Sequence, residues 1–270
     1  MTHSRPAVRD LLTSRGLAPR RELGQNFVAD PNTVRRIAHL ARVAGGDRVV
    51  EIGAGLGSLT LALAETGATV TAVELDHGLA DVLRDVVAGV PNVSVVEADA
   101  MRLDWSALLG GADGWVLVAN LPYNVATPLV ADLLDGVPAI ERMLVMVQRE
   151  VGERLVARPG SSAYGGISVK VAYWATARLA GFVPAAVFMP RPNVESALVE
   201  IARRSPPDVP PDDLFALVRA AFGQRRKMLR RSLAGVVDPA AFVAAGVPET
   251  ARPEDLGLDE WVRLTKAVHA

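Results

Sequence analysis

The sequence of 270 residues contains no cysteine. This absence excludes a disulfide framework, thiol catalysis and zinc or iron–sulfur clusters held by cysteine. The four histidines are scattered without the spacing of helical metal ligands, so we expect no metal site. Aromatic residues make up only 5% of the chain, but 50% of the residues are hydrophobic. That share suffices for a sizeable core and excludes a globally disordered protein.

Long apolar runs are also lacking. No run approaches the ~20 residues of a membrane span, and the N-terminal residues 1–10 lack the apolar core of a signal peptide. We therefore expect a cytoplasmic protein without a membrane anchor. The net charge is only −1, which by itself indicates no nucleic-acid partner. However, residues 74–113 carry eight acids and two bases, whereas residues 214–237 carry six bases and no acid.

Valine-rich apolar runs alternate with helix-compatible segments from residue 48 onward. Such runs are typical of parallel strands that are buried on both faces, and their alternation with helices predicts an α/β fold with a doubly wound, mostly parallel sheet. The predicted strands are residues 48–52, 69–75, 92–98, 115–119, 143–147 and 197–201. The helices predicted up to residue 177 are 7–15, 58–65, 77–87, 105–109 and 167–177.

A proline-rich segment, residues 205–211, marks a domain boundary because proline can neither continue a helix nor pair inside a sheet. We predict a main domain over residues 1–204, including an N-terminal basic arm. A small all-α domain is predicted over residues 212–270, with helices at 212–231, 239–245 and 259–268.

Polar residues or glycines stand at the carboxyl ends of four of the predicted strands. They are Gly53, Glu74, Asp99 and Asn120, separated by 21, 25 and 21 positions. Because ligands of open parallel sheets bind at the carboxyl ends of the strands, we expect all four at one site. Glu74 is suited to a ribose diol. Asp99 could bind an adenine amino group, with Leu75 and Ala100 offering apolar contacts to the ring.

The glycine-rich turn, Glu51-Ile-Gly53-Ala-Gly55-Leu-Gly57-Ser58, lets a ligand approach the backbone closely. A dinucleotide site requires the pattern G-x-G-x-x-G/A, but position 58 is serine. The turn therefore favours a cofactor without phosphates. A purely structural turn remains an alternative for this motif taken alone.

The fourth strand ends in Asn120-Leu121-Pro122-Tyr123. The asparagine amide can both accept and donate hydrogen bonds, the proline makes the turn rigid, and the tyrosine ring can lie flat on a base. The side-chain carbonyl of Asn120 and the backbone carbonyl of Leu121 or Pro122 could accept the two hydrogens of an amino group.

Together these residues resemble the family of small-subunit ribosomal RNA adenine dimethyltransferases, and the resemblance covers nearly the whole chain. One departure is Val28, where the family usually has leucine. The matching motifs are Gly24-Gln-Asn26-Phe-Val28, Glu51–Gly57, Glu74-Leu-Asp76, Asp99-Ala100, Asn120-Leu-Pro-Tyr123, Phe188-Met-Pro190-Arg-Pro192-Asn-Val194-Glu-Ser196 and Phe222-Gly-Gln-Arg-Arg-Lys227.

The resemblance implies a Rossmann-like enzyme that uses S-adenosylmethionine to make N6,N6-dimethyladenosine in ribosomal RNA. Asn26 and Val28 should close over the cofactor, and Gly53 and Gly55 should receive its methionine end. Asn120 should serve both cofactor and target base. Tyr123 and Phe188 look like the pair of rings that holds the target adenine between them.

The resemblance further implies that the chain, as a monomer, acts on the small-subunit RNA of an immature ribosomal subunit. The basic stretch in the second domain is expected to bind phosphates because no acid interrupts it. Three alternatives remain: a large-subunit RNA methylase, which usually has isoleucine in place of Leu121, a non-catalytic assembly or transcription factor, and an NAD-dependent oxidoreductase. The residues expected to bind RNA are Arg225, Arg226, Lys227, Arg230 and Arg231.

Overall fold

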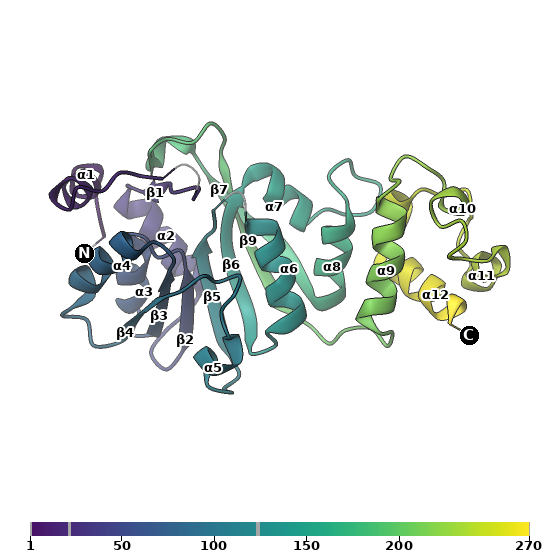
Figure 1. Cartoon of the computed structure of the whole chain (residues 1–270), viewed down its shortest axis with the longest axis horizontal. Helices are drawn as coiled ribbons and strands as arrows, with labels where there is room; N and C mark the ends of the chain where they lie inside the picture. The colour runs from purple at the N-terminus through teal and green to yellow at the C-terminus, as the bar shows by residue number, and fades with distance from the viewer. Residues whose placement is uncertain (1, 21–22, 123–124, 270) are drawn as a thin grey trace. The chain divides into compact units, whose positions relative to one another are not determined.

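The computed structural model describes residues 2–20, 23–122 and 125–269, which separate into two compact units (Figure 1). The first unit contains the residues up to Gly152 together with Arg178–Ala202. The second unit contains Glu153–Ala177 and the residues from Arg203 onward. No helix of the described residues is both long and apolar enough to span a membrane.

The first unit is built on a seven-stranded sheet with the order β4-β3-β2-β5-β6-β9-β7. The strands β2 to β6 run parallel, and β9 is antiparallel to β6. The predicted doubly wound, mostly parallel α/β sheet is therefore confirmed. Its strands are β2 (Arg48–Ile52), β3 (Thr69–Glu74), β4 (Val93–Glu97), β5 (Trp115–Asn120), β6 (Ile140–Gln148), β7 (Ala175–Val183) and β9 (Ser196–Arg203).

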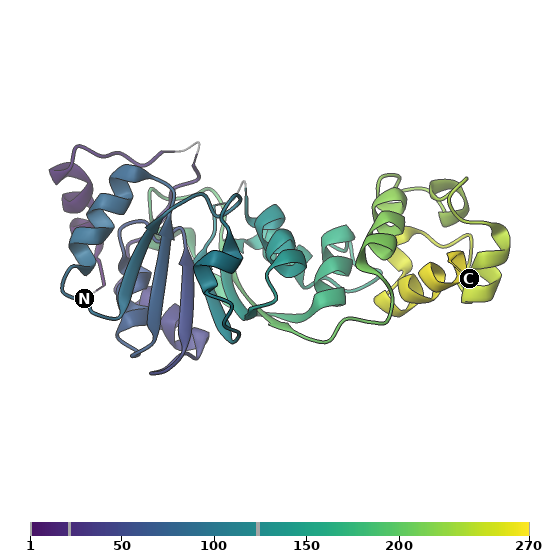
Figure 2. The ribbon, with the colours of Figure 1, turned by 60° about the horizontal axis from the view of Figure 1, so that its bottom comes forward.

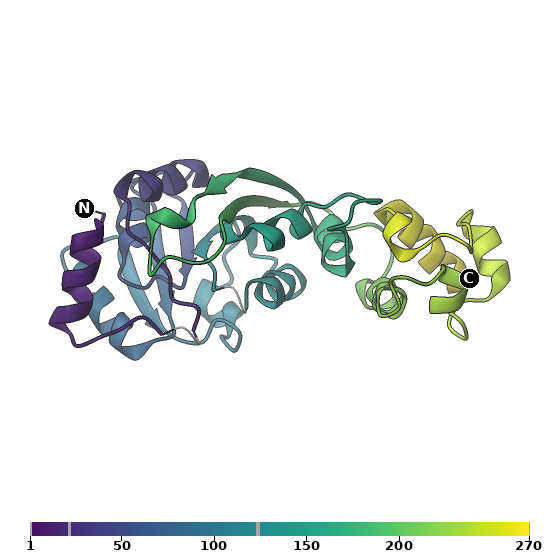
Figure 3. The same ribbon diagram turned by 90° about the horizontal axis from the view of Figure 1, so that it is seen from above.

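Helices cover both faces of this sheet, and Figure 3 shows α2 and α6 on opposite sides of the strands. Side chains alternate along each strand, so Val116 and Val118 on β5 pack against α2 and α3 in one cluster, whereas Leu117 points to the opposite face. The helices of this unit are α1 (Arg5–Ser14), α2 (Pro31–Ala41), α3 (Ser58–Ala64), α4 (His77–Val87), α5 (Trp105–Leu109) and α6 (Ala126–Gly136). A further helix, α7 (Arg149–Leu155), follows β6.

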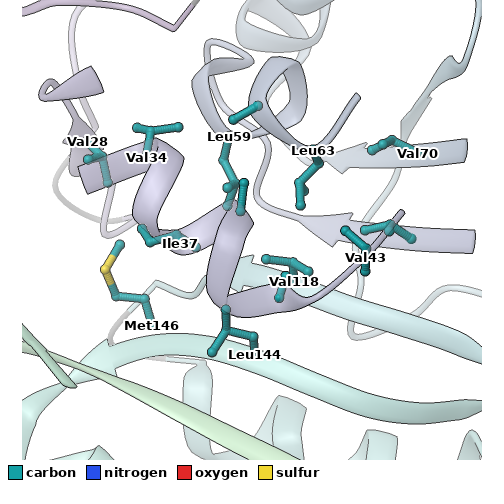
Figure 4. Packing of buried hydrophobic residues seen from close by; sticks show 14 of the residues in the cluster. Val28, Val34, Ile37, Val43, Leu59, Leu63, Val70, Val118, Leu144 and Met146 are labelled. Carbon is teal, nitrogen blue, oxygen red and sulfur yellow. The ribbon is translucent and has the colours of Figure 1, made fainter. Parts of the chain in front are cut away.

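Figure 4 shows the centre of this cluster, where Val34 and Ile37 of α2 meet Leu59 and Leu63 of α3. Ile37 and Leu63 are at most 2% exposed. Full burial of one such side chain contributes roughly 1.5–3 kcal/mol. The cluster thus anchors α3, the helix that begins immediately after the glycine-rich turn, and so positions that turn.

A short second sheet brings the N-terminal segment back to the first unit. β1 (Phe27–Val28) pairs antiparallel with β8 (Phe188–Met189), which follows the 3-10 helix η1 (Ala185–Val187). Figure 1 shows the green segment between β7 and β9 beside β1. As a result, the segment 23–28 lies next to the carboxyl ends of the sheet strands.

The second unit is all-helical, and Figure 2 shows its C-terminal helices in green and yellow. Its core surrounds the fully buried Trp261. The unit also includes Glu153–Ala177, which the sequence analysis placed in the first domain. Tyr164 donates a hydrogen bond to the Leu256 carbonyl (2.9 Å) and Tyr173 donates one to the Val209 carbonyl (2.7 Å). The helices are α8 (Gly166–Trp174), α9 (Pro211–Phe222), α10 (Leu229–Ser232), α11 (Pro239–Ala245), η2 (Pro253–Asp255) and α12 (Leu258–Val268).

Two predicted helices end earlier than expected. The helix predicted over residues 167–177 ends at Trp174, because Ala175 is extended and begins β7 at the edge of the sheet. The helix predicted over 212–231 ends at Phe222, and a turn leads to α10. In that turn the Leu229 N–H donates to the Ala251 carbonyl (2.8 Å), a tertiary hydrogen bond that replaces the helical one.

Candidate active site

A pocket lies at the carboxyl ends of the parallel strands in the first unit. Gly53, Glu74, Asp99 and Asn120, which lie at or just after the carboxyl ends of four different strands, all line it. The fold therefore brings these four residues, which are distant in the sequence, to one pocket. The pocket also includes Asn26, Val28, Gly55, Leu75, Ala100, Leu121 and Pro122.

The glycine-rich turn has a backbone conformation that side chains disfavour. Gly53, Gly55 and Gly57 have φ angles of 72°, 57° and 80°, in the left-handed region where only glycine is unstrained. A Cβ at Gly57 would lie 2.7 Å from Leu83 Cδ1. The turn therefore needs glycine at this position both for its conformation and for the packing of α4 against α3.

Glu74 is held by the backbone around it. Its Oε2 accepts a hydrogen bond from the Gly55 N–H (2.7 Å) and its Oε1 accepts one from the Asp76 N–H (2.9 Å). The side chain is buried, and burial raises its pKa above the usual value. Each carboxylate oxygen can accept a second hydrogen bond, so the orientation of Glu74 is suited to a diol.

Asp76, two residues later, has a different role. It caps α4 by accepting a hydrogen bond from the Leu79 N–H (3.1 Å), and Arg20 of the N-terminal arm lies 3.1 Å from it. Gln25 also donates to Asp76 (3.4 Å). The structure therefore separates the two acids of the Glu-Leu-Asp motif: Glu74 lines the pocket, and Asp76 caps a helix and binds the arm.

Just after the adjacent strand β4, the Asp99 side chain accepts a hydrogen bond from the Met101 N–H (2.9 Å). The exposed Leu75 side chain, 51% accessible, offers an apolar surface in the same pocket. An acceptor beside an apolar contact surface matches an adenine ring with its amino group.

Asn120 is oriented by the N-terminal segment. Its Nδ2 donates a hydrogen bond to the Asn26 carbonyl (3.0 Å), which leaves Oδ1 as the acceptor for a ligand. The Pro122 carbonyl already accepts hydrogen bonds from the N–H groups of Val125 (3.2 Å) and Ala126 (3.1 Å). Of the two backbone carbonyls considered from sequence, the geometry therefore favours that of Leu121.

Tyr123 and Phe188 are the two rings predicted to stack on the target base. Tyr123 lies outside the described residues. Phe188 is only 1% exposed and packs in the cluster with Val28, Val34 and Ile37. It does not line the pocket, because pairing of Phe188 with Val28 across β8 and β1 directs its ring to the core. In this geometry Phe188 offers no face to a base.

Glu51 is a pocket residue to which the sequence analysis gave no role. Its side chain is 2% exposed and accepts a hydrogen bond from the Thr60 hydroxyl (2.6 Å). Burial, with a smaller contribution from the negative charge of Glu74, raises the pKa of Glu51 to about 8 despite the hydrogen bond from Thr60, which lowers it. The sequence contained an indication of this position. A single carboxyl side chain interrupts a valine-rich strand two positions before Gly53, and residues two positions apart on a strand lie on the same face.

We expect Glu51→Gln to change the pH dependence of stability. The pKa of Glu51 is higher in the folded state, so the free energy of unfolding decreases as the pH rises from about 4.5 to about 8. Glutamine keeps an acceptor for Thr60 but carries no charge. At pH 8 the variant should be more stable by an amount on the order of a few kcal/mol.

Thermal unfolding of Glu51→Gln between pH 5 and 8 measures this effect, with exposed Glu141→Gln as the control. Parallel pH profiles for the wild type and Glu51→Gln would contradict the raised pKa.

The charge of the pocket limits its ligand. Glu51, Glu74 and Asp99 line it, whereas none of the described lining residues is Lys, Arg or His. Because Glu51 is largely protonated below its raised pKa of about 8, Glu74 and Asp99 supply the negative charge of the pocket, which favours a positively charged ligand and disfavours the pyrophosphate of a dinucleotide. Among the described residues, no group of three or more His, Asp or Glu side chains could hold a metal ion.

The basic residues predicted to bind RNA lie in the second unit, between α9 and the end of α10. Arg225 donates from Nε to Glu254 (2.6 Å) and from Nη2 to the Ser162 carbonyl (2.8 Å). Arg230 pairs with Glu249 (3.1 Å). Within the described part of the chain no carboxylate pairs with the remaining three, which are exposed: Arg226, Lys227 and Arg231.

Relatives of this chain are known over nearly its full length. Ribosomal RNA small subunit methyltransferase A from Streptomyces coelicolor is 47% identical over 272 residues, covering 96% of this chain and 94% of the relative. The protein of that name from Kineococcus radiotolerans is 50% identical over 268 residues, covering 95% and 88%.

Two solved structures share the fold. The first is a dimethyladenosine transferase from Plasmodium falciparum, with a TM-score of 0.74 and 23% identity over 87% of this chain and 94% of that one. The second is the 23S rRNA methyltransferase ErmE, with a TM-score of 0.68 and 27% identity over 90% and 100%. Residues 16–269 match the family described as Ribosomal RNA adenine dimethylase. With its four strand-end motifs in one pocket, a family match over residues 16–269 and relatives that align over nearly the whole chain, the chain belongs to the ribosomal RNA adenine dimethylase family.

Proposed function

We propose that this enzyme transfers methyl groups from S-adenosylmethionine to the N6 amino group of adenosines in small-subunit ribosomal RNA. The product is N6,N6-dimethyladenosine, and the reaction is a step of ribosome biogenesis. The observation that carries the proposal is the pocket that unites Asn120 and Leu121 with three carboxyl side chains and, among its described residues, no base. The relatives named ribosomal RNA small subunit methyltransferase A support this choice of RNA.

The pocket residues fit S-adenosylmethionine, whose sulfonium supplies an activated methyl group. Gly53 and Gly55 would receive the methionine end, and Glu74 would accept hydrogen bonds from the ribose. Asp99 would accept one from the adenine amino group while Leu75 and Ala100 contact the ring. Asn26 and Val28 would close the pocket from the N-terminal side. The acidic lining compensates the positive charge of this cofactor, a match that a dinucleotide lacks.

The target adenine presents a weak nucleophile, because the lone pair of its amino nitrogen is delocalised into the ring. Asn120 Oδ1 and the Leu121 carbonyl would accept its two N–H hydrogens. This favours a pyramidal nitrogen with its lone pair directed at the methyl group. Holding the reactants in this geometry can supply about 7–11 kcal/mol. The same hydrogen bonds strengthen as positive charge develops on the nitrogen, which stabilises the transition state selectively.

No strong base is needed after transfer, because an alkylated aromatic ammonium is acidic and can release its proton to water. The base must first leave its stack, at a cost of a few kcal/mol. Stacking on Tyr123 remains a prediction. We further propose that the immature small ribosomal subunit is the substrate, in the cytoplasm, and that the chain acts as a monomer.

Mass spectrometry of ribosomal RNA from cells with and without the protein tests the proposal. Dimethyladenosine should disappear from small-subunit RNA when the protein is absent and return with its gene. Because ErmE shares the fold over its full length, transfer of tritium from labelled cofactor to purified small- and large-subunit RNA should be compared in parallel. Label on the large-subunit RNA alone would refute the proposed substrate. If neither RNA is labelled and the protein does not bind the cofactor, a non-catalytic role is favoured instead.

A further inference from the structure

Arginine side chains converge on residues 182–188 of the first unit, which run from the end of β7 to the start of β8. Arg36 donates from Nη1 to the Phe182 carbonyl (3.2 Å). Arg5 donates from Nη2 to the carbonyls of Ala186 (2.6 Å) and Phe188 (3.1 Å). The Arg149 guanidinium carbon lies 4.9 Å from the centre of the Phe182 ring. Residues far apart in the sequence thus hold guanidinium groups on one short segment.

These groups leave an excess of positive charge. Arg5 and Arg36 bind backbone carbonyls, which satisfy their donors but do not neutralise their charge. Within the residues that the structure describes, no ion pair joins either of them to a carboxylate. Glu195 pairs with Arg149 at 3.1 Å, and both side chains are about half exposed. Of the groups named here, three arginines and one carboxylate surround residues 182–188, so positive charge is in excess among them.

Phe182 is an exposed aromatic residue that contacts two of these arginines, Arg36 and Arg149. Its side chain is 40% accessible, although burial of a phenylalanine is strongly favourable. A ring beside a guanidinium plane, in a positively charged surface, is the combination on which unpaired bases stack. We call Arg5, Arg36, Arg149 and Phe182 the aromatic–arginine surface.

The aromatic–arginine surface adjoins the active-site pocket. Asn120 on β5 is in register with Met146 on β6, and both line the pocket. Arg149 follows Met146 by three residues, a distance of about 10 Å along an extended chain. Its N–H donates to the Glu195 carbonyl (3.0 Å), where β9 is about to begin. Surface and pocket therefore share the same edge of the sheet.

We propose that the aromatic–arginine surface binds an unpaired RNA nucleotide next to the target adenosine. The base stacks on Phe182, and Arg36 and Arg149 bind the flanking phosphates. This inference rests on the proposed function, because it presumes an RNA substrate whose target base occupies the neighbouring pocket. A single strand is favoured over a duplex, because stacking on a side chain requires a base that is free of its own stack.

Binding of a fluorescent single-stranded RNA of about 15 nucleotides, containing adenosine, tests the proposal. Phe182→Leu keeps an apolar side chain but loses the flat ring, so the affinity should fall about tenfold. Phe182→Tyr should bind like the wild type. Arg149→Gln should also reduce the slope of log affinity against log salt by about one. The same sequence as a duplex should bind with little dependence on Phe182.

A substitution that is expected to strengthen RNA binding provides an internal check. Glu195→Gln removes the carboxylate that competes with phosphate for Arg149, so it should strengthen RNA binding. Arg178→Gln is the matched control for Arg149→Gln, because Arg178 is an exposed arginine on β7 that pairs with Glu200 and not with Glu195. Thermal unfolding and cofactor calorimetry of each variant separate RNA binding from folding.

Methylation of small-subunit RNA distinguishes the two proposals. A wild type that methylates this RNA while Phe182→Leu and Arg149→Gln retain full affinity would overturn the role of the surface and leave the function intact. Conversely, a wild type that transfers no methyl group, yet binds RNA through Phe182, would overturn the function and support the surface. A single-stranded probe that does not bind the wild type also contradicts the inference.

Discussion

Replacing Asn120 by alanine should lower the rate of methyl transfer by a factor on the order of 10²–10³ or more, while cofactor affinity changes little. The side chain contributes an acceptor that strengthens its hydrogen bond only as charge develops on the target nitrogen, and loss of one such group costs a rate factor of this size. Its Nδ2 is held by the Asn26 carbonyl at 3.0 Å, so Oδ1 is already oriented before substrate binds.

Asn120→Asp separates the two roles of this side chain. Aspartate keeps an acceptor oxygen but loses the donor to Asn26, and so its transfer rate should lie between those of the alanine variant and the wild type. Single-turnover transfer from tritiated cofactor measures the rate, and calorimetry measures cofactor binding. Near-normal transfer by Asn120→Ala would show that another group orients the target amino group.

The double variant Arg226→Glu, Lys227→Glu should lower RNA affinity by a factor on the order of 10 to 100 at low salt. Both side chains are exposed, and no carboxylate pairs with them within the described residues, so they are free to bind phosphate. Each lost phosphate contact should reduce the salt slope by about one. Because neither side chain supports the fold, the melting temperature should stay close to that of the wild type.

Arg225→Glu is the informative comparison. Arg225 joins Glu254 and the Ser162 carbonyl in the second unit, so its reversal should cost stability, on the order of 1–3 kcal/mol. Filter binding across a salt series and thermal unfolding resolve the two effects. An unchanged salt slope for Arg226→Glu, Lys227→Glu would mean that this turn does not bind RNA. Loss of RNA binding without loss of stability in Arg225→Glu would restore its predicted phosphate contact.

The strand ends were predictable because they depend on local patterns. Continuous valine-rich runs specify buried parallel strands, and the carboxyl ends of such strands share an edge wherever the connections are βα units. This is why Gly53, Glu74, Asp99 and Asn120, which are distant in sequence, line one pocket as expected.

The edge strand β7 and the ion pairs of the basic stretch were less predictable from the sequence. Residues 175–177 continue a helical sequence pattern, but in the structure they belong to β7, which pairs with β9 at the edge of the sheet. The basic stretch contains no acid of its own, yet Glu249 and Glu254 reach Arg230 and Arg225 from another part of the chain. A charge count over consecutive residues cannot include partners that tertiary folding supplies.

The sequence by itself determined the parallel strands of the sheet, their order along the chain and the kinds of residue that meet at its carboxyl edge, because the pattern of side chains along a buried strand is local. Only the tertiary structure decided the acceptor oxygen of Asn120, the raised pKa of Glu51, the burial of Phe188 and the meeting of Arg149 with Phe182. Each of these depends on a neighbour that lies far away in the chain, and contact with such a neighbour has no local sequence pattern.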